Sequence, residues 1–435
     1  MRPALPTTVR PGLLLGLGAH GGARHGRLSA MDVDLAVVGA GGAGLSLFVH
    51  LDHRWPAGRR PPSIALVDPV RRQGDDRTWC FWTAADDDPV GGPLAAAVHR
   101  SWRRVELVDV DGRSRVLDLG PLRYVMIRSG EFYALAEKAV ARLRAVRVPA
   151  GADAVGTGLV RAGGTDVSAR WILDSRPAPP RRPATTALLQ HFRGWTVRFA
   201  RSPGGPGGPG SPGGHRLDPD VPVLMDFSVP QPAHGVAFGY VLPSSDRRAL
   251  VEYTEFSRQR LPDAAYEGAL AGYLRQRFDV GPGDYVVEHV EDGAIPMTDA
   301  VHARRAGPGV FRIGTAGGAT RGSTGYAFAA MQRQAVGLAE ALIAGREPLP
   351  PPAYPSRHRW LDAVMLRALD RGITPGPQLF VRLFERNPPE RVLRFLDGTT
   401  GPADELRVMA SAPMAPMLRA GAGDALARLA RRRSR

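Results

Sequence analysis

The sequence predicts an α/β fold in which a parallel sheet with helices is interrupted by an antiparallel β-sheet and followed by a helical C-terminal region. Three observations indicate this architecture. Near residue 39 a short apolar strand runs into a glycine-rich turn and a helix. In the middle of the chain, strand-like segments follow one another. Beyond residue 350 the apolar residues recur with a helical period.

The first element is a strand at residues 34–38, which continues into Gly39-Ala40-Gly41-Gly42-Ala43-Gly44 and a helical stretch at Leu45–Leu51. A second apolar run, Ile64–Val67, ends at Asp68. Strand, glycine turn, helix, strand and acid in this order are typical of a βαβ unit that binds a dinucleotide. A glycine-rich loop that binds no ligand is the alternative interpretation.

Each residue of this motif has its own physical role. Gly39 permits the tight turn, Gly41 lets the backbone approach a pyrophosphate, and Gly44 permits close packing of the helix. The N-terminus of the helix offers N–H groups to the anion. Asp68 accepts hydrogen bonds from a ribose hydroxyl. These features predict a dinucleotide but do not separate NAD from FAD.

A second glycine turn lies about 275 residues further along the chain. It follows a strand at Val310–Ile313, precedes a helix from about 328 to 344, and contributes Gly314, Gly317 and Gly318. Two such turns so far apart in sequence indicate a chain that wraps around a long cofactor, which favours FAD. We therefore expect a Rossmann-like FAD-binding domain of the FAD-dependent oxidoreductase type, formed by residues 31–180 and 285–350.

Residues 181–284 are expected to form an inserted antiparallel β-sheet domain that binds the substrate. Its strands are predicted at Val221–Val229, Gly235–Val241 and Ala249–Thr254, with a flexible Gly/Pro loop at 202–214. Residues 351–427 are expected to be helical, because their apolar residues follow a helical pattern, which is broken at Pro355, Pro375 and Pro388.

The composition is that of a globular protein, with 435 residues, 43% of them hydrophobic and 23% charged. The single cysteine, Cys80, excludes an internal disulfide. The sequence contains no stretch of 18 apolar residues, so no transmembrane helix is predicted. This size and composition exclude a disulfide miniprotein and a coiled coil, and they leave room for two or three domains.

The net charge of +15 raises the question of nucleic-acid binding, but the charge distribution argues against it. Nine arginines lie in residues 1–30 and 428–435, which leaves about +6 for the rest of the chain. We interpret residues 1–30 as a disordered basic extension or a misassigned start before Met31. The Arg-rich tail, 428–435, either lies near an anionic membrane surface or is simply solvated.

Several motifs, taken together and in this order, resemble the lycopene cyclase family over residues 32–400. They are Asp76–Trp82, Gln190–Trp195, Met225-Asp226-Phe227, Phe238–Pro243, Ala249–Thr254, Ala294–Met297 and Gly317–Phe328. The resemblance implies a lycopene β-cyclase, a flavoprotein that cyclises the ψ-ends of lycopene to β-ionone rings. It implies reduced FAD, with NAD(P)H as the reductant, and no net redox change. The resemblance does not decide whether one or both ends are cyclised, or whether the ring formed is β or ε.

The resemblance also implies functional residues. The terminal alkene is protonated, the ring closes through a carbocation, and a proton is lost. Glu252 and Asp226 match the acids of the family motifs, and a structural ion-paired acid is the alternative for each. Aromatic faces stabilise a cation, and the candidate tunnel walls are Trp79, Trp82, Phe238, Tyr240, Tyr326 and Phe328. Each of these aromatics is otherwise a core residue. Tyr253 stands where the family has a second acid beside Glu252.

Since lycopene is too apolar to travel through water, we expect a peripheral protein at the cytoplasmic face of a membrane. Residues 360–366 and 381–384 are the candidate membrane contacts, unless their apolar faces pack on the body of the protein. Other carotenoid-pathway enzymes are candidate partners; a nucleic acid is not. Two alternatives remain: a flavin-dependent monooxygenase or isoprenoid reductase on the same fold, and a non-catalytic membrane or nucleic-acid binder.

Overall fold

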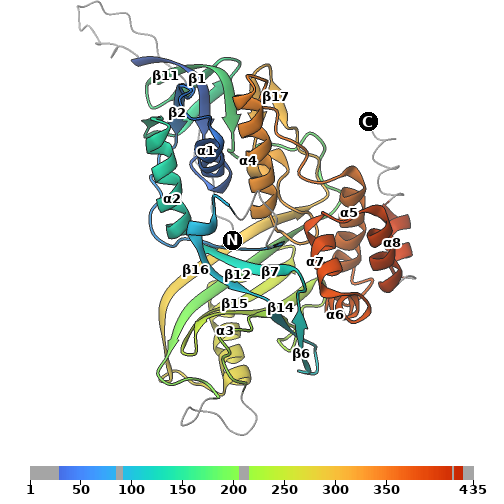
Figure 1. Ribbon diagram of the computed structural model, residues 1–435. Helices are drawn as coiled ribbons and strands as arrows, with labels where there is room; N and C mark the ends of the chain where they lie inside the picture. Colours follow the sequence, from blue (N-terminus) through green and yellow to red (C-terminus); the bar gives the residue numbers. More distant parts are fainter. Residues whose placement is uncertain (1–28, 85–91, 205–214, 414–415, 425–435) are drawn as a thin grey trace, which may run out of the picture.

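The computed structural model describes residues 29–84, 92–204, 215–413 and 416–424. Three predicted features fall wholly or mostly outside these residues. They are the N-terminal extension, the Gly/Pro loop at 202–214 and the Arg-rich tail at 428–435. The described chain has an upper α/β layer, a lower β-sheet layer and a group of helices on one side (Figure 1).

The upper layer is the predicted dinucleotide-binding domain. Its core is a parallel sheet in the order β18-β11-β1-β2-β8, formed by β18 (Val310–Arg312), β11 (Thr165–Asp174), β1 (Ser29–Val38), β2 (Ile64–Val67) and β8 (Val146–Val148). The edge strands β9 (Ala152–Gly156), β10 (Leu159–Ala162) and β17 (Arg305–Gly307) are antiparallel. The strands β2 and β18 agree with the prediction, whereas β1 begins five residues earlier than expected.

Three helices cover this sheet. Helix α1 (Gly42–Arg54) packs against both α2 (Ser129–Arg142) and α4 (Phe328–Ile343). The buried apolar side chains of β1, α1, α2 and α4 form one core cluster. The parallel sheet delivers the ends of β1, β2 and β11 to the same edge, which is where ligands bind in folds of this kind.

The lower layer is a seven-stranded sheet in the order β16-β12-β15-β14-β13-β5-β6. The strands are β16 (Tyr285–Thr298), β12 (Ala187–Phe199), β15 (Arg248–Ser257), β14 (Val236–Ser245), β13 (Val223–Asp226), β5 (Arg104–Val108) and β6 (Ser114–Asp118). Helix α3 (Asp263–Phe278) packs on one face of this sheet, and the other face points toward the upper layer (Figure 1).

The predicted domain boundaries are wrong at two places. Strands β5 and β6 lie inside the expected first FAD segment, and β16 lies inside the second, yet all three belong to the lower sheet. The chain therefore enters this sheet from three separate segments. Strand membership is set by long-range pairing, so the local sequence pattern did not reveal it. Helix α3 was also not predicted.

A small third sheet lies between the two layers, in the order β3-β7-β4. It is formed by β3 (Thr78–Ala84), β7 (Leu122–Arg128) and β4 (Val98–Trp102). Strand β3 carries most of the aromatic motif at 76–82, so this sheet brings the motif to the interface of the two layers.

The C-terminal region is helical, as predicted, with α5 (Ser356–Asp370), α6 (Gly376–Arg386), α7 (Pro389–Asp397) and α8 (Pro402–Ser411). Pro355, Pro375 and Pro388 each stand directly before one of the first three helices. Proline is tolerated at a helix start, where its missing N–H would have no helical partner. In the described part of the chain, no helix is both long and apolar enough to cross a membrane.

Candidate active site

The first glycine turn connects β1 to α1. Gly39 has a φ of +102°, and a Cβ there would lie 2.1 Å from the Oγ of Ser175. A Cβ at Gly44 would lie 2.1 Å from the carbonyl oxygen of Gly39. At Gly41, by contrast, no described atom lies within 4 Å of the Cβ position, so the backbone there is open to a ligand. The three glycines therefore fit the three roles predicted for them.

The start of α1 is suited to an anion. Its N-cap residue is Gly41, and among the described residues no side chain caps it and no acid occupies its first turn. The N–H groups of the first turn therefore point toward the open space beside Gly41. This is a cradle in which a pyrophosphate fits.

Asp68 lies at the end of β2, beside the glycine turn. Its Oδ2 accepts a hydrogen bond of 2.6 Å from the Ala40 N–H, and its Oδ1 accepts one of 2.8 Å from the Val70 N–H. Arg72 donates a hydrogen bond of 3.1 Å to the Ala40 carbonyl oxygen. Asp68 thus holds the turn itself, while keeping lone pairs for a ribose hydroxyl. No sequence pattern distinguished Arg72 among so many arginines.

The second glycine turn packs directly on the first. A Cβ at Gly314 would lie 2.8 Å from the Cβ of Ala43, at the start of α1. Gly314 and Gly318 have φ values of +63° and +80°, and a Cβ at Gly317 would lie 2.3 Å from the Arg312 carbonyl oxygen. The two turns, distant in sequence, thus form one continuous surface, as the prediction of a long cofactor requires.

Two cavities adjoin this surface. The larger one, of about 530 Å³, is lined by Gly317 and Gly318 of the second turn and by Ser175. The other, of about 240 Å³, lies between the upper layer and the lower sheet. Thr315 and Thr320 line both cavities, so the cavities meet at the second glycine turn. A long cofactor on the two turns would therefore reach the second cavity, which we call the central cavity.

Alternation along the strands explains which side chains reach the central cavity. Strands β12, β14 and β15 of the lower sheet contribute residues two apart, because successive side chains point to opposite faces. They are Gln190 and Phe192 of β12, Phe238 and Tyr240 of β14, and Leu250, Glu252, Thr254 and Phe256 of β15. The residues between them face α3.

Five of the six predicted aromatic residues line this cavity: Trp79, Phe238, Tyr240, Tyr326 and Phe328. Trp79 stacks on Phe328, with ring centroids 5.0 Å apart. Trp82, the sixth, is buried behind the wall, where its ring meets that of Tyr326 edge-on at 4.8 Å. Trp82 therefore supports a wall residue and does not itself contact the cavity.

A cluster of hydroxyl and thiol groups forms one end of the central cavity. Tyr124 and Tyr240 are hydrogen-bonded to each other through their hydroxyl groups, and Cys80 and Tyr326 lie beside them. Burial raises the pKa of both tyrosines well above its ordinary value and raises the pKa of the Cys80 thiol to about 12. These groups are therefore neutral at physiological pH. Tyr124 was not predicted, because it belongs to no recognised motif.

Glu252 lies in the middle of β15 and faces the central cavity, with only 9% of its surface exposed. Its Oε1 accepts a hydrogen bond of 2.6 Å from the Thr254 hydroxyl. Burial, with a smaller contribution from the charge of Glu291, raises the pKa of Glu252 to about 8. The carboxyl group is therefore protonated at neutral pH, as a general acid must be.

Asp226 does not share this site. It faces α3, where its Oδ2 accepts hydrogen bonds of 2.8 Å from Arg277 and 2.9 Å from the Tyr273 hydroxyl. It pairs across β14 with Gly239, whose position also faces Tyr273. The expectation that Asp226 acts beside Glu252 disagrees with this placement, because the sheet separates the two carboxyl groups. Asp226 fits the alternative of an ion-paired structural acid.

Tyr253, the departure from the family pattern, also points away from the central cavity. Its hydroxyl donates a hydrogen bond of 3.3 Å to Glu255 on the α3 face. The residue that does approach Glu252 is Glu291 of β16, which is buried and was not singled out in the sequence. Only the pairing of β16 with β12 brings it there.

Solved structures with a similar fold are flavin-associated enzymes of several kinds. A geranylgeranyl bacteriochlorophyll reductase-like protein from Thermoplasma acidophilum has a TM-score of 0.54 at 13% identity, with 90% of this chain and 99% of that chain covered. A p-nitrophenol 4-monooxygenase from Pseudomonas putida DLL-E4 has a TM-score of 0.53 at 13% identity, with 91% and 98% covered. A flavin-dependent brominase has a TM-score of 0.50 at 12% identity, with 85% and 94% covered. The chain therefore has the fold of FAD-dependent oxidoreductases and monooxygenases.

The sequence comparisons go further than the fold. No curated protein sequence matches the chain. The model of the lycopene cyclase protein family matches residues 34–422, which is most of the chain. The resemblance inferred from the motifs is thereby confirmed, and the chain belongs to the lycopene cyclase family.

Proposed function

We propose that the protein is a lycopene β-cyclase that catalyses an acid-initiated, non-redox cyclisation of the ψ-ends of lycopene. The observation that carries this proposal is Glu252, a carboxyl group that burial keeps protonated within an aromatic-walled cavity. An alkene is a weak base, so its protonation needs an acid that is still protonated. Water would stabilise the carboxylate form of the acid, so the acid must be shielded from water. A buried, protonated glutamic acid meets this need.

In the proposed reaction the O–H bond of Glu252 breaks and a C–H bond forms at the terminal alkene of the substrate. The resulting carbocation is attacked by a second double bond of the same chain, which closes the ring. Loss of a proton from the ring gives the product, an isomer of the substrate. Electrons and atoms balance without an oxidant or a reductant, since one proton is gained and one is lost.

The walls of the central cavity suit a cationic intermediate. The faces of Trp79, Phe238 and Phe328 attract positive charge, by about 0.5–2 kcal/mol for each well-placed ring. The same apolar rings exclude water, which would otherwise trap the cation. The neutral hydroxyl groups of Tyr240 and Tyr326 place oxygen lone pairs near the developing charge without acting as strong bases.

FAD is the proposed cofactor, in its reduced form, with NAD(P)H as the reductant. Gly39, Gly41 and Gly44 with the start of α1 would hold its pyrophosphate, and Gly314, Gly317 and Gly318 would support the part that reaches the central cavity. When bound, the reduced flavin supplies negative charge near the developing cation. The residues of this chain provide the acid, the walls and the exclusion of water.

A peripheral position at the cytoplasmic face of a membrane is proposed for access to the substrate. A mostly apolar cavity of about 140 Å³ lies among the C-terminal helices, and Trp360 and Leu418 at its rim are 51% and 65% exposed. Of the predicted contacts, Leu383 and Phe384 are buried in the core, so only the first, at Trp360, has an exposed apolar side chain. Exposed large apolar residues near an apolar cavity are typical of a lipid-facing surface.

A second candidate function is a flavin-dependent redox reaction, because the structural neighbours include a reductase-like protein and a monooxygenase. Anaerobic incubation of the protein with lycopene in liposomes, FAD and NADPH separates the two. A cyclase yields γ-carotene and then β-carotene by chromatography without stoichiometric loss of NADPH. Steady consumption of NADPH without a cyclised product would instead indicate the redox enzyme.

A further inference from the structure

We infer that Glu291 is a proton-relay residue that returns a proton to Glu252 after each turnover, from a small polar pocket beside the central cavity on the same face of the lower sheet. The inference rests on the proposed function, because it concerns the same acid. It assigns a role to a carboxyl group that the catalytic scheme above does not use.

The geometry of the relay comes from the strand register. Gly194 of β12 is paired with Glu252 of β15 on one side and with Glu291 of β16 on the other. A Cβ at Gly194 would lie 3.5 Å from the Oε2 of Glu252 and 3.3 Å from the Cγ of Glu291. Both acidic side chains therefore lean over the glycine into the same space. Any larger residue at position 194 would fill the gap in which they meet.

The two acids open on different spaces. Glu252 lines the central cavity, and Glu291 does not. Glu291 instead lines a small pocket of about 30 Å³, together with Asp75, His99, Arg128, Arg248 and His289, among others. This volume is enough for about one water molecule. His289 is exposed, so the pocket lies at the solvent boundary. The pair thus bridges solvent and the closed cavity.

Glu291 is held in place without being neutralised by an ion pair. It is 8% exposed, and its Oε2 accepts a hydrogen bond of 3.0 Å from the Thr78 hydroxyl of β3. Within the described residues no arginine forms an ion pair with it, and Arg128 is paired with Asp75. A carboxyl group that is buried but lacks a cationic partner can carry a proton, whereas an ion-paired one stays charged.

The surroundings of the two carboxyl groups raise the pKa of each of them. Burial raises the pKa of Glu291 to about 7, opposed by the Thr78 hydrogen bond and by Arg77 and Arg128, while Asp75 raises it. The pKa of Glu252 is raised to about 8, and Thr254 is its hydrogen-bond donor. Burial thus raises the pKa of both carboxyl groups, so that each can carry a proton near neutral pH.

The relay is needed because the proton that leaves the substrate departs from a different carbon than the one that Glu252 protonates. After transfer, Glu252 is a carboxylate in an apolar cavity. In the relay step the O–H bond of Glu291 breaks and an O–H bond forms on Glu252. A proton from water in the polar pocket then restores Glu291. A water molecule acts as the base that takes the proton lost by the ring and carries it to the solvent, so one proton enters and one leaves in each turnover.

The test compares single and multiple turnovers of the FAD-loaded protein with lycopene in liposomes. In Glu291→Gln the first turnover keeps its rate, because Glu252 already carries its proton, and later turnovers slow by about tenfold or more. The alkaline limb of the pH–rate profile also moves to lower pH, because the charge that raises the pKa of Glu252 is gone. Glu291→Asp restores part of the multiple-turnover rate.

The matched control is Glu288→Gln on the same strand, at a glutamate bound by Arg198 and Arg248 at the surface. This variant leaves the rates of the first and of the later turnovers unchanged. If Glu291→Gln does not fold, Thr78→Val replaces it, and we expect the same slowing of later turnovers. Equal loss of first and later turnovers, or an unchanged rate and pH profile, would overturn the relay. Absence of cyclised product from the wild-type protein would instead overturn the proposed function itself.

Discussion

At the scale of single residues, the chemistry depends on one carboxyl group in an unusual setting. Glu252 was predicted because it matches the acid of a lycopene cyclase motif and lies in an otherwise apolar strand. Its partners were not recognisable. Thr254 follows from the alternation of a strand, but Gly194 and Glu291 approach Glu252 only through the pairing of β12 with β15 and β16. A register shift of one residue would send these side chains to opposite faces.

The raised pKa of Glu252 predicts a pH-dependent stability. The folded protein keeps the proton up to about pH 8, whereas the unfolded chain releases it near the ordinary glutamate pKa of 4.5. The stability from this group is therefore full below pH 4.5 and is lost as the pH rises through 8. We expect the free energy of unfolding of Glu252→Gln, relative to that of the wild type, to rise by about 1 kcal/mol or more between pH 5 and pH 8.5. Thermal unfolding at both pH values measures this, and a constant difference would contradict it.

The open position at Gly41 predicts a loss of cofactor without a loss of fold. A Cβ there meets no described protein atom within 4 Å, and the φ of −88° suits alanine. Gly41→Ala should fold normally and lose most of its flavin absorbance after purification, because the new methyl group occupies the space of the pyrophosphate. Gly268→Ala, at an equally open glycine on α3, is the control and should retain flavin. Full flavin content in both variants would show that the cofactor does not bind at this turn.

At the scale of elements, the local patterns predicted the helices and buried strands well, but not the membership of the lower sheet. Apolar runs and prolines act within a few residues, so β2, α4 and the starts of α5, α6 and α7 could be located. Strands β5, β6 and β16 join partners far away in sequence, and no local pattern records that. Helix α3 was missed because its apolar residues form only a weak helical stripe.

Asp226 illustrates the same limit, since a buried acid in a motif is ambiguous until its face of the sheet is known. It fixes α3 to the lower sheet through Arg277 and Tyr273. Asp226→Ala leaves the buried Arg277 with one fewer partner, and we expect a loss of about 3–5 kcal/mol in the free energy of unfolding. Chemical denaturation checks this. Asp226→Asn with normal stability but no cyclisation would return Asp226 to a catalytic role.

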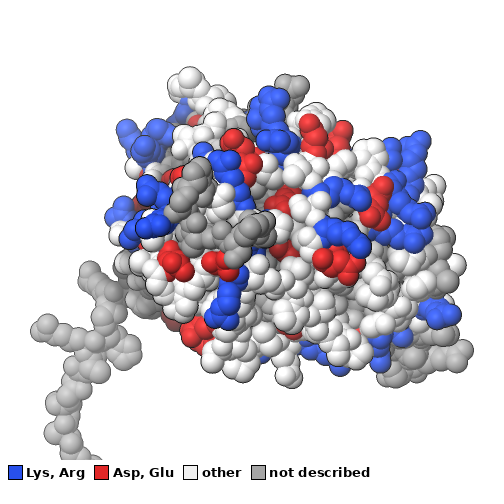
Figure 2. All heavy atoms as spheres, turned by 90° about the horizontal axis from the view of Figure 1, so that it is seen from below, with Lys and Arg blue, Asp and Glu red and all other residues white. Residues whose placement is uncertain are grey.

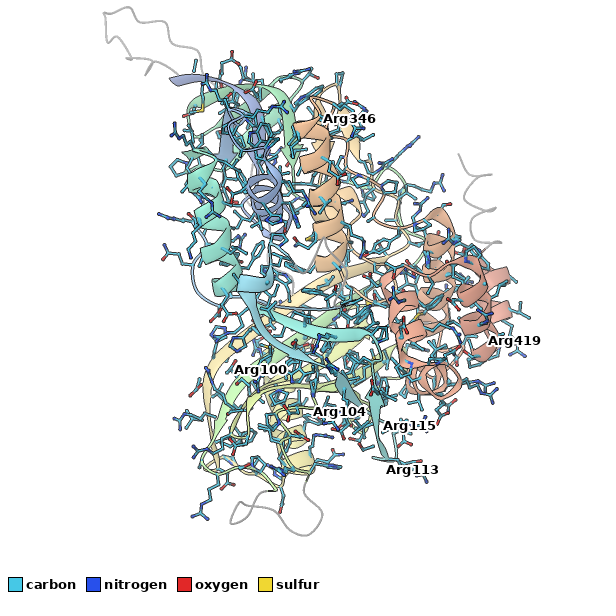
Figure 3. All side chains as sticks on the ribbon, in the orientation of Figure 1. Arg100, Arg104, Arg113, Arg115, Arg346 and Arg419 are labelled. Carbon is cyan, nitrogen blue, oxygen red and sulfur yellow. The ribbon has the colours of Figure 1, made fainter. Side chains whose placement is uncertain are left out.

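At the scale of the whole molecule, the fold places a cofactor-binding layer over a sheet whose inner face carries the acid. Figure 2 shows basic and acidic side chains interspersed on the lower face. Of the arginines labelled in Figure 3, Arg104, Arg113 and Arg115 lie around β5 and β6, whereas Arg346 follows α4 and Arg419 lies beyond α8. A continuous basic stripe for nucleic acid is not seen on these views.

The proposed membrane contact belongs to this scale, because it concerns how the C-terminal helices would meet a bilayer. We expect Trp360→Asp to weaken binding to phosphatidylcholine/phosphatidylglycerol liposomes severalfold, since a charge replaces an exposed indole at the apolar cavity. Co-sedimentation measures the bound fraction. Val286→Asp, at an exposed valine on the edge strand β16, is the control and should bind as the wild type does. Equal binding by both variants would place the lipid-facing surface elsewhere.

The central claim is that Glu252 is the acid that starts cyclisation, and product analysis of Glu252→Gln tests it most directly. The matched control is Glu255→Gln, at a buried glutamate three residues away whose side chain faces α3. With lycopene in liposomes, reduced FAD and no oxygen, the wild type and the control should form β-carotene. Glu252→Gln should fold, retain flavin and lose about 10²–10⁴-fold in rate. Cyclisation by Glu252→Gln at the wild-type rate would contradict the account.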